Sequence, residues 1–237
     1  MNNPHEHRRT VLHLPMGEFW SGDLGLTLIT ISLTFLIFII PPLREAGISG
    51  RLFFDIVLVG LMVYAALVVN QSRAATAFLI SVLLVTAVVL GTGRLQPSLF
   101  LHQIGSVLST ITPLLYIRIV AIVVFRGGPV TWSRIQGGIC IYLLIGMVWA
   151  SAFQLVEQLY PGSFHFVSAP EDIDQLTSKL TYFSFSTLTT IGFGDVHPLH
   201  PFARSLAIAE AVMGQLFPAI FIGALVAMAM QSRNNRS

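Results

Sequence analysis

The stretch TTIGFGD reads Thr189-Thr190-Ile191-Gly192-Phe193-Gly194-Asp195. Its two glycines alternate with bulky apolar residues, and glycine is the residue that adopts a positive φ without strain. A backbone with this freedom can turn successive carbonyl oxygens toward one side, where together they replace the hydration shell of a cation. A bare Gly-x-Gly also occurs in simple turns between helices, so the interpretation rests on all seven residues. We call residues 189–195 the filter segment.

The filter segment resembles the selectivity filter of potassium channels, which has the pattern T-x-G-[YF]-G-D. The resemblance implies that K⁺ is bound by backbone carbonyls and by one threonine hydroxyl. The implied K⁺ ligands are the backbone carbonyls of Thr190, Ile191, Gly192 and Phe193 and the hydroxyl of Thr190, with Gly194 completing the filter. K⁺ would then be the permeating ion, and no other cofactor is expected.

The composition predicts an all-α membrane protein. The chain has 237 residues, of which only 10% are charged, whereas soluble domains carry about 25% charged residues. Charged residues and helix breakers separate six apolar stretches, each close to the roughly 20 residues that cross a bilayer. The predicted spans are 24–43, 56–71, 74–93, 95–117, 135–156 and 205–231. The net charge of +2 gives no indication of a nucleic-acid partner, and the single Cys140 excludes a disulfide within the chain.

A seventh segment, between the fifth and sixth spans, is too short and too polar to cross a membrane. Residues 175–189 (QLTSKLTYFSFSTLT) follow a loop at 160–174, and 15 helical residues reach only about 22 Å. Non-helical backbone survives at membrane depth only inside protein or beside water. The sequence therefore predicts a re-entrant pore helix and filter loop. One chain supplies one filter strand, so the pore needs several copies, and the resemblance implies a homotetramer.

The predicted organisation has four parts. They are a cytoplasmic N-terminal tail (1–23), a four-helix peripheral membrane domain (24–126), a pore domain (127–231) and a cytoplasmic C-terminal tail (232–237). The pore domain holds the outer helix, the pore helix, the filter segment and the inner helix. The resemblance places Asp195 outside the cell, so both termini lie in the cytoplasm. We expect a multi-pass protein of a bacterial inner (plasma) membrane.

The fourth span gives no sign of voltage sensing. Moving one charge through the membrane field is worth about 2.3 kcal/mol per 100 mV, so steep voltage gating needs several arginines. Here Arg118 stands alone at the end of the span. The sequence does not indicate the gating stimulus.

Three residues depart from the common potassium-channel pattern. Phe193 replaces the commoner tyrosine, which removes a hydroxyl that can hold the filter. Ser186 stands where some bacterial channels have a carboxylate behind the filter. Tyr182 stands where a tryptophan commonly reaches the filter aspartate, and its phenol can donate to Asp195. We therefore expect filter support from Tyr182, Ser186, Thr189 and Asp195.

Glu210 is the only charged residue of the sixth span. An acid in an apolar span is costly and usually faces protein or water. It lies one helical turn before Gly214 and so on the same face. Either it hydrogen-bonds behind the filter, to a hydroxyl of Ser184, Ser186 or Thr187, or it only anchors the sixth span to a neighbouring helix.

The sixth span also carries the predicted gate. Gly214, Pro218, Phe221 and Leu225 recur at helical spacing, so we expect one stripe facing the cavity. Pro218 removes the hydrogen bond to the carbonyl of Gly214, which predicts a hinge there. The alternative is that Gly214 only permits close packing.

Charged and titratable side chains gather near the expected outer mouth. The acids Glu171, Asp172, Asp174 and Asp195 are either a cation-attracting ring or solvated loop residues. The histidines His165, His197 and His200 are either proton or metal sensors or, more simply, solvated loop residues.

The resemblance implies a potassium-selective channel that passes K⁺ down its electrochemical gradient, with the lipid bilayer and further copies of the chain as partners. A poorly selective cation channel and a non-conducting modulatory subunit are the alternatives. We do not expect an enzyme, because no nucleophile with a base, zinc helix or haem-ligating histidine pair occurs at workable spacing.

Overall fold

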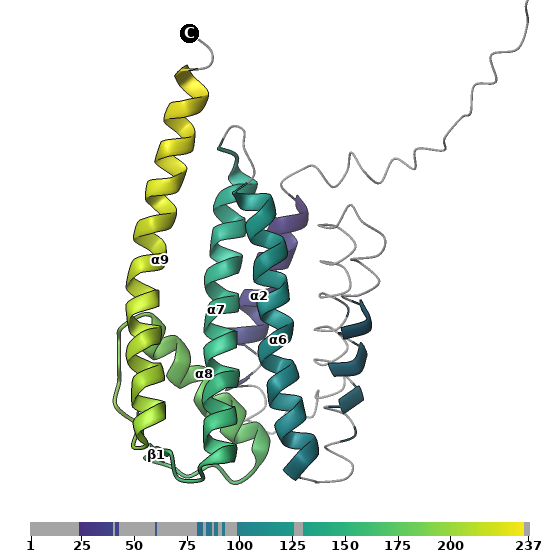
Figure 1. Ribbon diagram of the computed structural model, residues 1–237, viewed down its shortest axis with the longest axis vertical. Coiled ribbons are helices and arrows are strands. Elements are labelled where there is room, and N and C mark those ends of the chain that lie inside the picture. Colours follow the sequence, from purple (N-terminus) through teal and green to yellow (C-terminus); the bar gives the residue numbers. More distant parts are fainter. Residues whose placement is uncertain are drawn as a thin grey trace, which may run out of the picture.

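The fold is known from a computed structural model, which describes residues 24–39, 41–42, 60, 80–82, 84–86, 88–89, 92, 99–125 and 130–234. The described part is mostly helical, with one small antiparallel sheet of two strands that a helix and the filter segment separate in the sequence (Figure 1). Its elements are α2 (Leu24–Phe38), α6 (Leu99–Val124), α7 (Trp132–Leu159), β1 (Phe164–Phe166), α8 (Ile173–Leu188), β2 (Val196–Pro198) and α9 (Pro201–Asn234).

Three described helices are long and apolar enough to cross a membrane, over Gln103–Ile122, Trp132–Leu159 and Pro201–Gln231. They correspond to the predicted fourth, fifth and sixth spans. The fourth span was predicted at 95–117, whereas α6 begins at Leu99 and continues past Arg118 to Val124. Arg118 is exposed on α6, and a long exposed side chain of this kind does not end a helix.

The first predicted span is shorter than expected, since α2 ends at Phe38. Its 15 residues reach about 22 Å, less than the roughly 30 Å of a bilayer core. The second and third predicted spans lie mostly outside the described residues, as do both predicted tails except for the first residues of the C-terminal one. Six spans therefore stay a prediction.

The helix α7 is the centre of the described structure, and it packs against α2, α6, α8 and α9. Figure 1 shows α8 beside the first half of α9, at the end of the bundle where β1 lies. Phe185 and Leu188 of α8 are buried in one apolar core with Leu144 of α7 and Phe221 of α9. This shared core fixes the end of α8, from which the filter segment continues.

The helix predicted at 175–189 is present as α8, which begins two residues earlier and ends one residue earlier. Asp172 is its N-cap, and the carboxylate oxygen Oδ1 accepts hydrogen bonds from the backbone N of Asp174 (2.9 Å) and Gln175 (2.8 Å). An N-cap of this kind satisfies backbone donors that have no partner within the helix.

The small sheet is absent from the sequence-based prediction, which had a plain loop at 160–174. The strand β1 pairs antiparallel with β2, with His165 opposite His197. Beside it Phe164 and Val196 pack with Phe153 and Phe183 in a second buried cluster. The chain next to this sheet holds the Asp195 end of the filter segment, because the backbone N of Val167 donates to the Asp195 carbonyl at 3.0 Å.

Candidate functional site

The filter segment has a positive φ at every second residue. The φ angles are 60° at Thr190, 60° at Gly192 and 84° at Gly194. Carbonyls of an ordinary extended strand point to alternate sides, whereas left-handed residues at alternate positions turn them to the same side. The positive φ that the sequence predicted at the two glycines is present.

Thr190 is the residue in this pattern that the sequence did not predict. A β-branched residue in the left-handed region is an outlier that costs of order 1–3 kcal/mol. Two bonds hold it: its backbone N donates to the Thr187 carbonyl at 2.9 Å, and its hydroxyl donates to the Thr189 carbonyl at 2.7 Å. Such strain persists only where the surroundings over-determine it, and it commonly marks a functional segment.

Gln215 of α9 also reaches this point, since its Nε2 lies 3.4 Å from Oγ1 of Thr190. The sequence analysis did not single out Gln215. A polar residue directly after Gly214 in an apolar span was the signal that could have found it. Its contact places the exposed face of α9 beside the inner end of the filter segment.

The end of α8 holds the filter segment through backbone hydrogen bonds. The Ser186 carbonyl accepts from the backbone N of Ile191 at 2.9 Å and of Gly192 at 3.1 Å. The Thr189 hydroxyl donates to the Phe185 carbonyl at 2.6 Å. Ser186 thus supports the segment with its main chain. The C-terminal end of α8 carries the negative end of the helix dipole, which favours a cation beside it.

Tyr182 lies against the outer side of the filter segment. Its ring stacks on Phe193 with centroids 5.9 Å apart. Partial burial raises the pKa of the Tyr182 phenol, and so does the neighbouring Asp195 carboxylate. Tyr182 thus lies beside Asp195, and its stacking on Phe193 gives it a direct contact with the filter segment.

Gly214 is a point of close contact between α9 and α8. A Cβ built on it would lie 1.8 Å from the carbonyl oxygen of Leu188 and 2.7 Å from its carbonyl carbon. The same carbonyl accepts a hydrogen bond from the Tyr142 hydroxyl of α7 at 3.2 Å. The packing alternative for Gly214 is thus what the geometry shows, and α9 is one helix through both Gly214 and Pro218.

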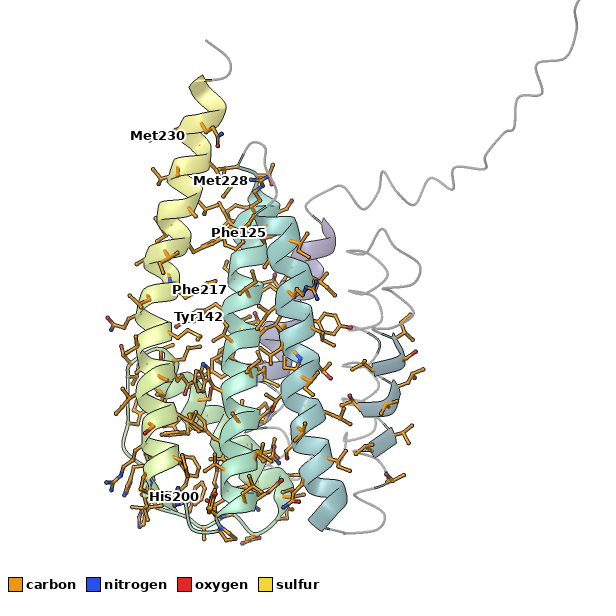
Figure 2. The ribbon with its side chains drawn as sticks, viewed as in Figure 1. Phe125, Tyr142, His200, Phe217, Met228 and Met230 are labelled. Atoms are coloured by element: carbon orange, nitrogen blue, oxygen red, sulfur yellow. The ribbon has the colours of Figure 1, made fainter. Side chains whose placement is uncertain are left out.

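The predicted cavity-facing stripe of α9 is divided in the single chain, where Pro218 is exposed and Phe221 and Leu225 lie at the core. Phe221 is buried, with its ring stacked on Phe217 at 5.8 Å and edge-on to Phe125 at 6.3 Å. Leu225 packs against the same core. Figure 2 shows Phe217 and Tyr142 between α9 and α7, where their ring centroids are 5.8 Å apart. The stripe with Gly214, Phe221 and Leu225 faces its own chain, because it is also the face that contacts α7 and α8.

Residues on other faces of α9 remain exposed in one chain. On the face of Gln215 these include Ile222 (61% exposed), Val226 (51%) and Met230 (69%). They follow Gln215 by two, three and four helical turns, and so they share its face. If a gate lies on α9, this face is the one that can line the cavity.

Glu210 is fully buried between α9 and α8. Of the three hydroxyls expected near it, Ser184 is the one that it contacts, with 2.5 Å between Oγ and the Glu210 Oε1. This contact joins α9 to α8, and it does not decide between the two alternatives.

The three histidines predicted near the outer mouth all contact other residues of the chain. His200 stacks on Tyr160 at 4.6 Å near the start of α9, and its Nδ1 accepts from the backbone N of Phe202 at 3.3 Å. Figure 2 shows His200 at the end of the bundle where α9 begins. His165 and His197 stack on each other across the two strands at 4.6 Å. Among the described residues, no group of three or more side chains is suited to hold a metal ion.

We expect the acids Glu171 and Asp174, which flank the N-cap of α8, to raise the local K⁺ concentration. Glu171→Gln combined with Asp174→Asn should lower inward current at 10 mM salt and leave it nearly unchanged at 1 M, because the Debye length falls from about 30 Å to about 3 Å. Asp172 is left intact because it caps α8. Single-channel recording at both salt concentrations measures the effect. An equal loss at both would instead mean that these acids are structural.

A cavity of about 600 Å³ lies between the end of α2 and the outer side of α8 and the filter segment. Its wall includes Phe38, Tyr182 and Phe193, and Phe38 also contacts Phe185 with ring centroids 5.4 Å apart. The helix α2 therefore ends close to the back of the filter segment.

Part of the chain is similar to a known protein family. Residues 137–231 match the family model described as "Ion channel", a range that contains most of α7, both strands, α8, the filter segment and most of α9. No curated protein matches the chain. Three described helices are long and apolar enough to cross a membrane, and residues 137–231 are similar to ion channel domains.

Proposed function

We propose that this protein is a potassium-selective channel that passes K⁺ down its electrochemical gradient through a pore formed by four copies of the chain. The observation that carries the proposal is the positive φ at Thr190, Gly192 and Gly194 within the sequence TTIGFGD. This alternation lets consecutive carbonyls face one side, which is what stripping water from K⁺ requires.

The surroundings of the filter segment suit a cation. The carbonyl end of α8 points its negative dipole end at the segment, Asp195 stands at the other end of the segment, and the exposed acids Glu171 and Asp172 precede α8. Glu210 is buried between α9 and α8, in contact with Ser184. The dipole of α8 is held in a fixed position, so it acts on the permeating ion without having to reorganise as the ion passes.

The test of this function is ion flux into liposomes that contain the purified protein. We expect K⁺ flux and almost no Na⁺ flux under the same gradient. Comparable fluxes of both ions would contradict the selectivity, and no flux from a correctly assembled protein would contradict conduction itself.

We expect the detergent-solubilised particle to contain four copies of the 25.9 kDa chain. In one chain the filter segment is exposed, with Ile191 at 59% and Phe193 at 65%, and one strand cannot surround an ion. Native mass spectrometry measures the copy number. A conducting monomer or dimer would rule out this architecture.

A further inference from the structure

The side chain of Glu210 occupies a site with no compensating charge. It is 0% exposed, lies within the apolar span of α9 and has no ion-pair partner among the described residues. Its second oxygen, Oε2, is buried without any hydrogen-bond partner. A buried carboxylate is costly unless it is paired and hydrogen-bonded, so the charged form fits this site poorly.

Counting protons around Ser184 leads to the same conclusion. The Ser184 hydroxyl oxygen lies 2.7 Å from the Gly146 carbonyl oxygen and 2.5 Å from Oε1 of Glu210. A hydroxyl has one proton to donate, and a carbonyl can only accept. If Ser184 donates to Gly146, the proton in the second contact must come from Glu210. An ionised Glu210 would leave one of these two short oxygen–oxygen contacts without a proton.

We infer that Glu210 is a neutral, protonated acid that donates to Ser184, and that the relay from Glu210 through Ser184 to Gly146 clamps α9 to α8 and α7. In this form the unpartnered Oε2 is only the carbonyl oxygen of an acid, whose burial costs far less than that of a charge. Among the described residues, the other titratable group facing Glu210 is the phenol of Tyr142 on α7.

The clamp lies one helical turn from the contact of Gly214 with Leu188. The inner helix thus holds α8 at two successive points on one face, close to Ser186, whose carbonyl accepts from two filter amides. A shift of α9 would therefore move α8 and, through the Ser186 carbonyl, the filter segment. Glu210 is therefore a positioning residue for the filter. At alkaline pH, loss of its proton would remove the donor and place a charge in the span, so the clamp should weaken.

The proton itself can be detected by infrared spectroscopy of the assembled protein. At neutral pH we expect the C=O stretch of a protonated carboxylic acid that shifts in D₂O and is missing in Glu210→Gln. Glu157→Gln is the matched control and should retain this band, because both oxygens of Glu157 accept N–H bonds, as an ionised carboxylate does. This readout does not depend on which ion the channel conducts. A parent protein without the band would overturn the inference.

The positioning role, which rests on the proposed function, has a separate readout. Glu210→Gln retains a donor for Ser184, whereas Glu210→Val does not. We expect the valine variant to lose conduction during sustained opening about fivefold faster, as for one lost hydrogen bond, and the glutamine variant to match the parent at neutral pH. The parent should lose conduction faster at alkaline pH and the glutamine variant should not. A glutamine variant with the parent's pH dependence would overturn the role, even if the valine variant fails to assemble.

Discussion

Gly192→Ala should abolish K⁺ conduction in a correctly assembled protein. Gly192 has a φ of +60°, and nothing lies within 4 Å of a Cβ built on it. The obstacle is therefore the backbone conformation, which costs an L-residue roughly 1–2 kcal/mol. Repeated in four copies, a cost of about 1 kcal/mol each amounts to nearly a thousandfold in the population of the conducting filter. Potassium efflux from liposomes measures the loss.

Gly162→Ala is the matched control for this experiment. Gly162 has a φ of +83° and the same open space around it, but it lies in the turn after α7 rather than in the filter segment. The strain is similar, so we expect a similar small loss of stability with conduction retained. Normal K⁺ flux in tetrameric Gly192→Ala would reject the filter assignment.

Gly214→Ala should damage the filter rather than a hinge. The new Cβ would meet the backbone of Leu188, with the carbonyl oxygen at 1.8 Å, and backbone atoms cannot rotate away as a side chain can. Inserting a methyl group into packed structure typically costs 1–3 kcal/mol, here in each chain. We expect a lower melting temperature of the assembly and a loss of K⁺ selectivity, because α8 must shift. Thermal unfolding and K⁺/Na⁺ flux ratios measure the two effects.

A hinge would give a different result, namely lower open probability with selectivity and stability unchanged. Gly223→Ala separates the effect of the contact from that of helix propensity. Gly223 lies on the same helix with nothing within 4 Å of its Cβ position, so this variant should keep its selectivity and gain stability of up to about 1 kcal/mol. Equal behaviour of the two variants would contradict the close contact at Gly214.

The sequence predicted those features that depend on local chemistry. Glycine is needed where φ is positive, and Gly192 and Gly194 have it. The polar segment predicted as a helix at 175–189 is helical, as α8. Glu210 was singled out because an acid is costly in an apolar span, and its contact with Ser184 follows from that cost.

Other features could not be predicted, because they depend on how distant parts of the chain meet. The small sheet pairs Phe164 with Pro198, which are far apart in the sequence. Its strands have only three residues each, so they carry almost no periodic signal. Helical spacing correctly put Gly214 and Phe221 on one face of α9, but spacing does not say where a face points. The contact of Gly214 with Leu188 turns that face toward α8.

Potassium selectivity through the filter segment is tested most directly by the reversal potential of purified protein in a planar bilayer, with K⁺ on one side and Na⁺ at equal concentration on the other. Carbonyl oxygens held by the alternating φ angles should admit K⁺ and exclude Na⁺. The prediction is a large reversal potential of the sign set by K⁺ leaving its own side. A reversal potential near zero, with current flowing, would contradict it.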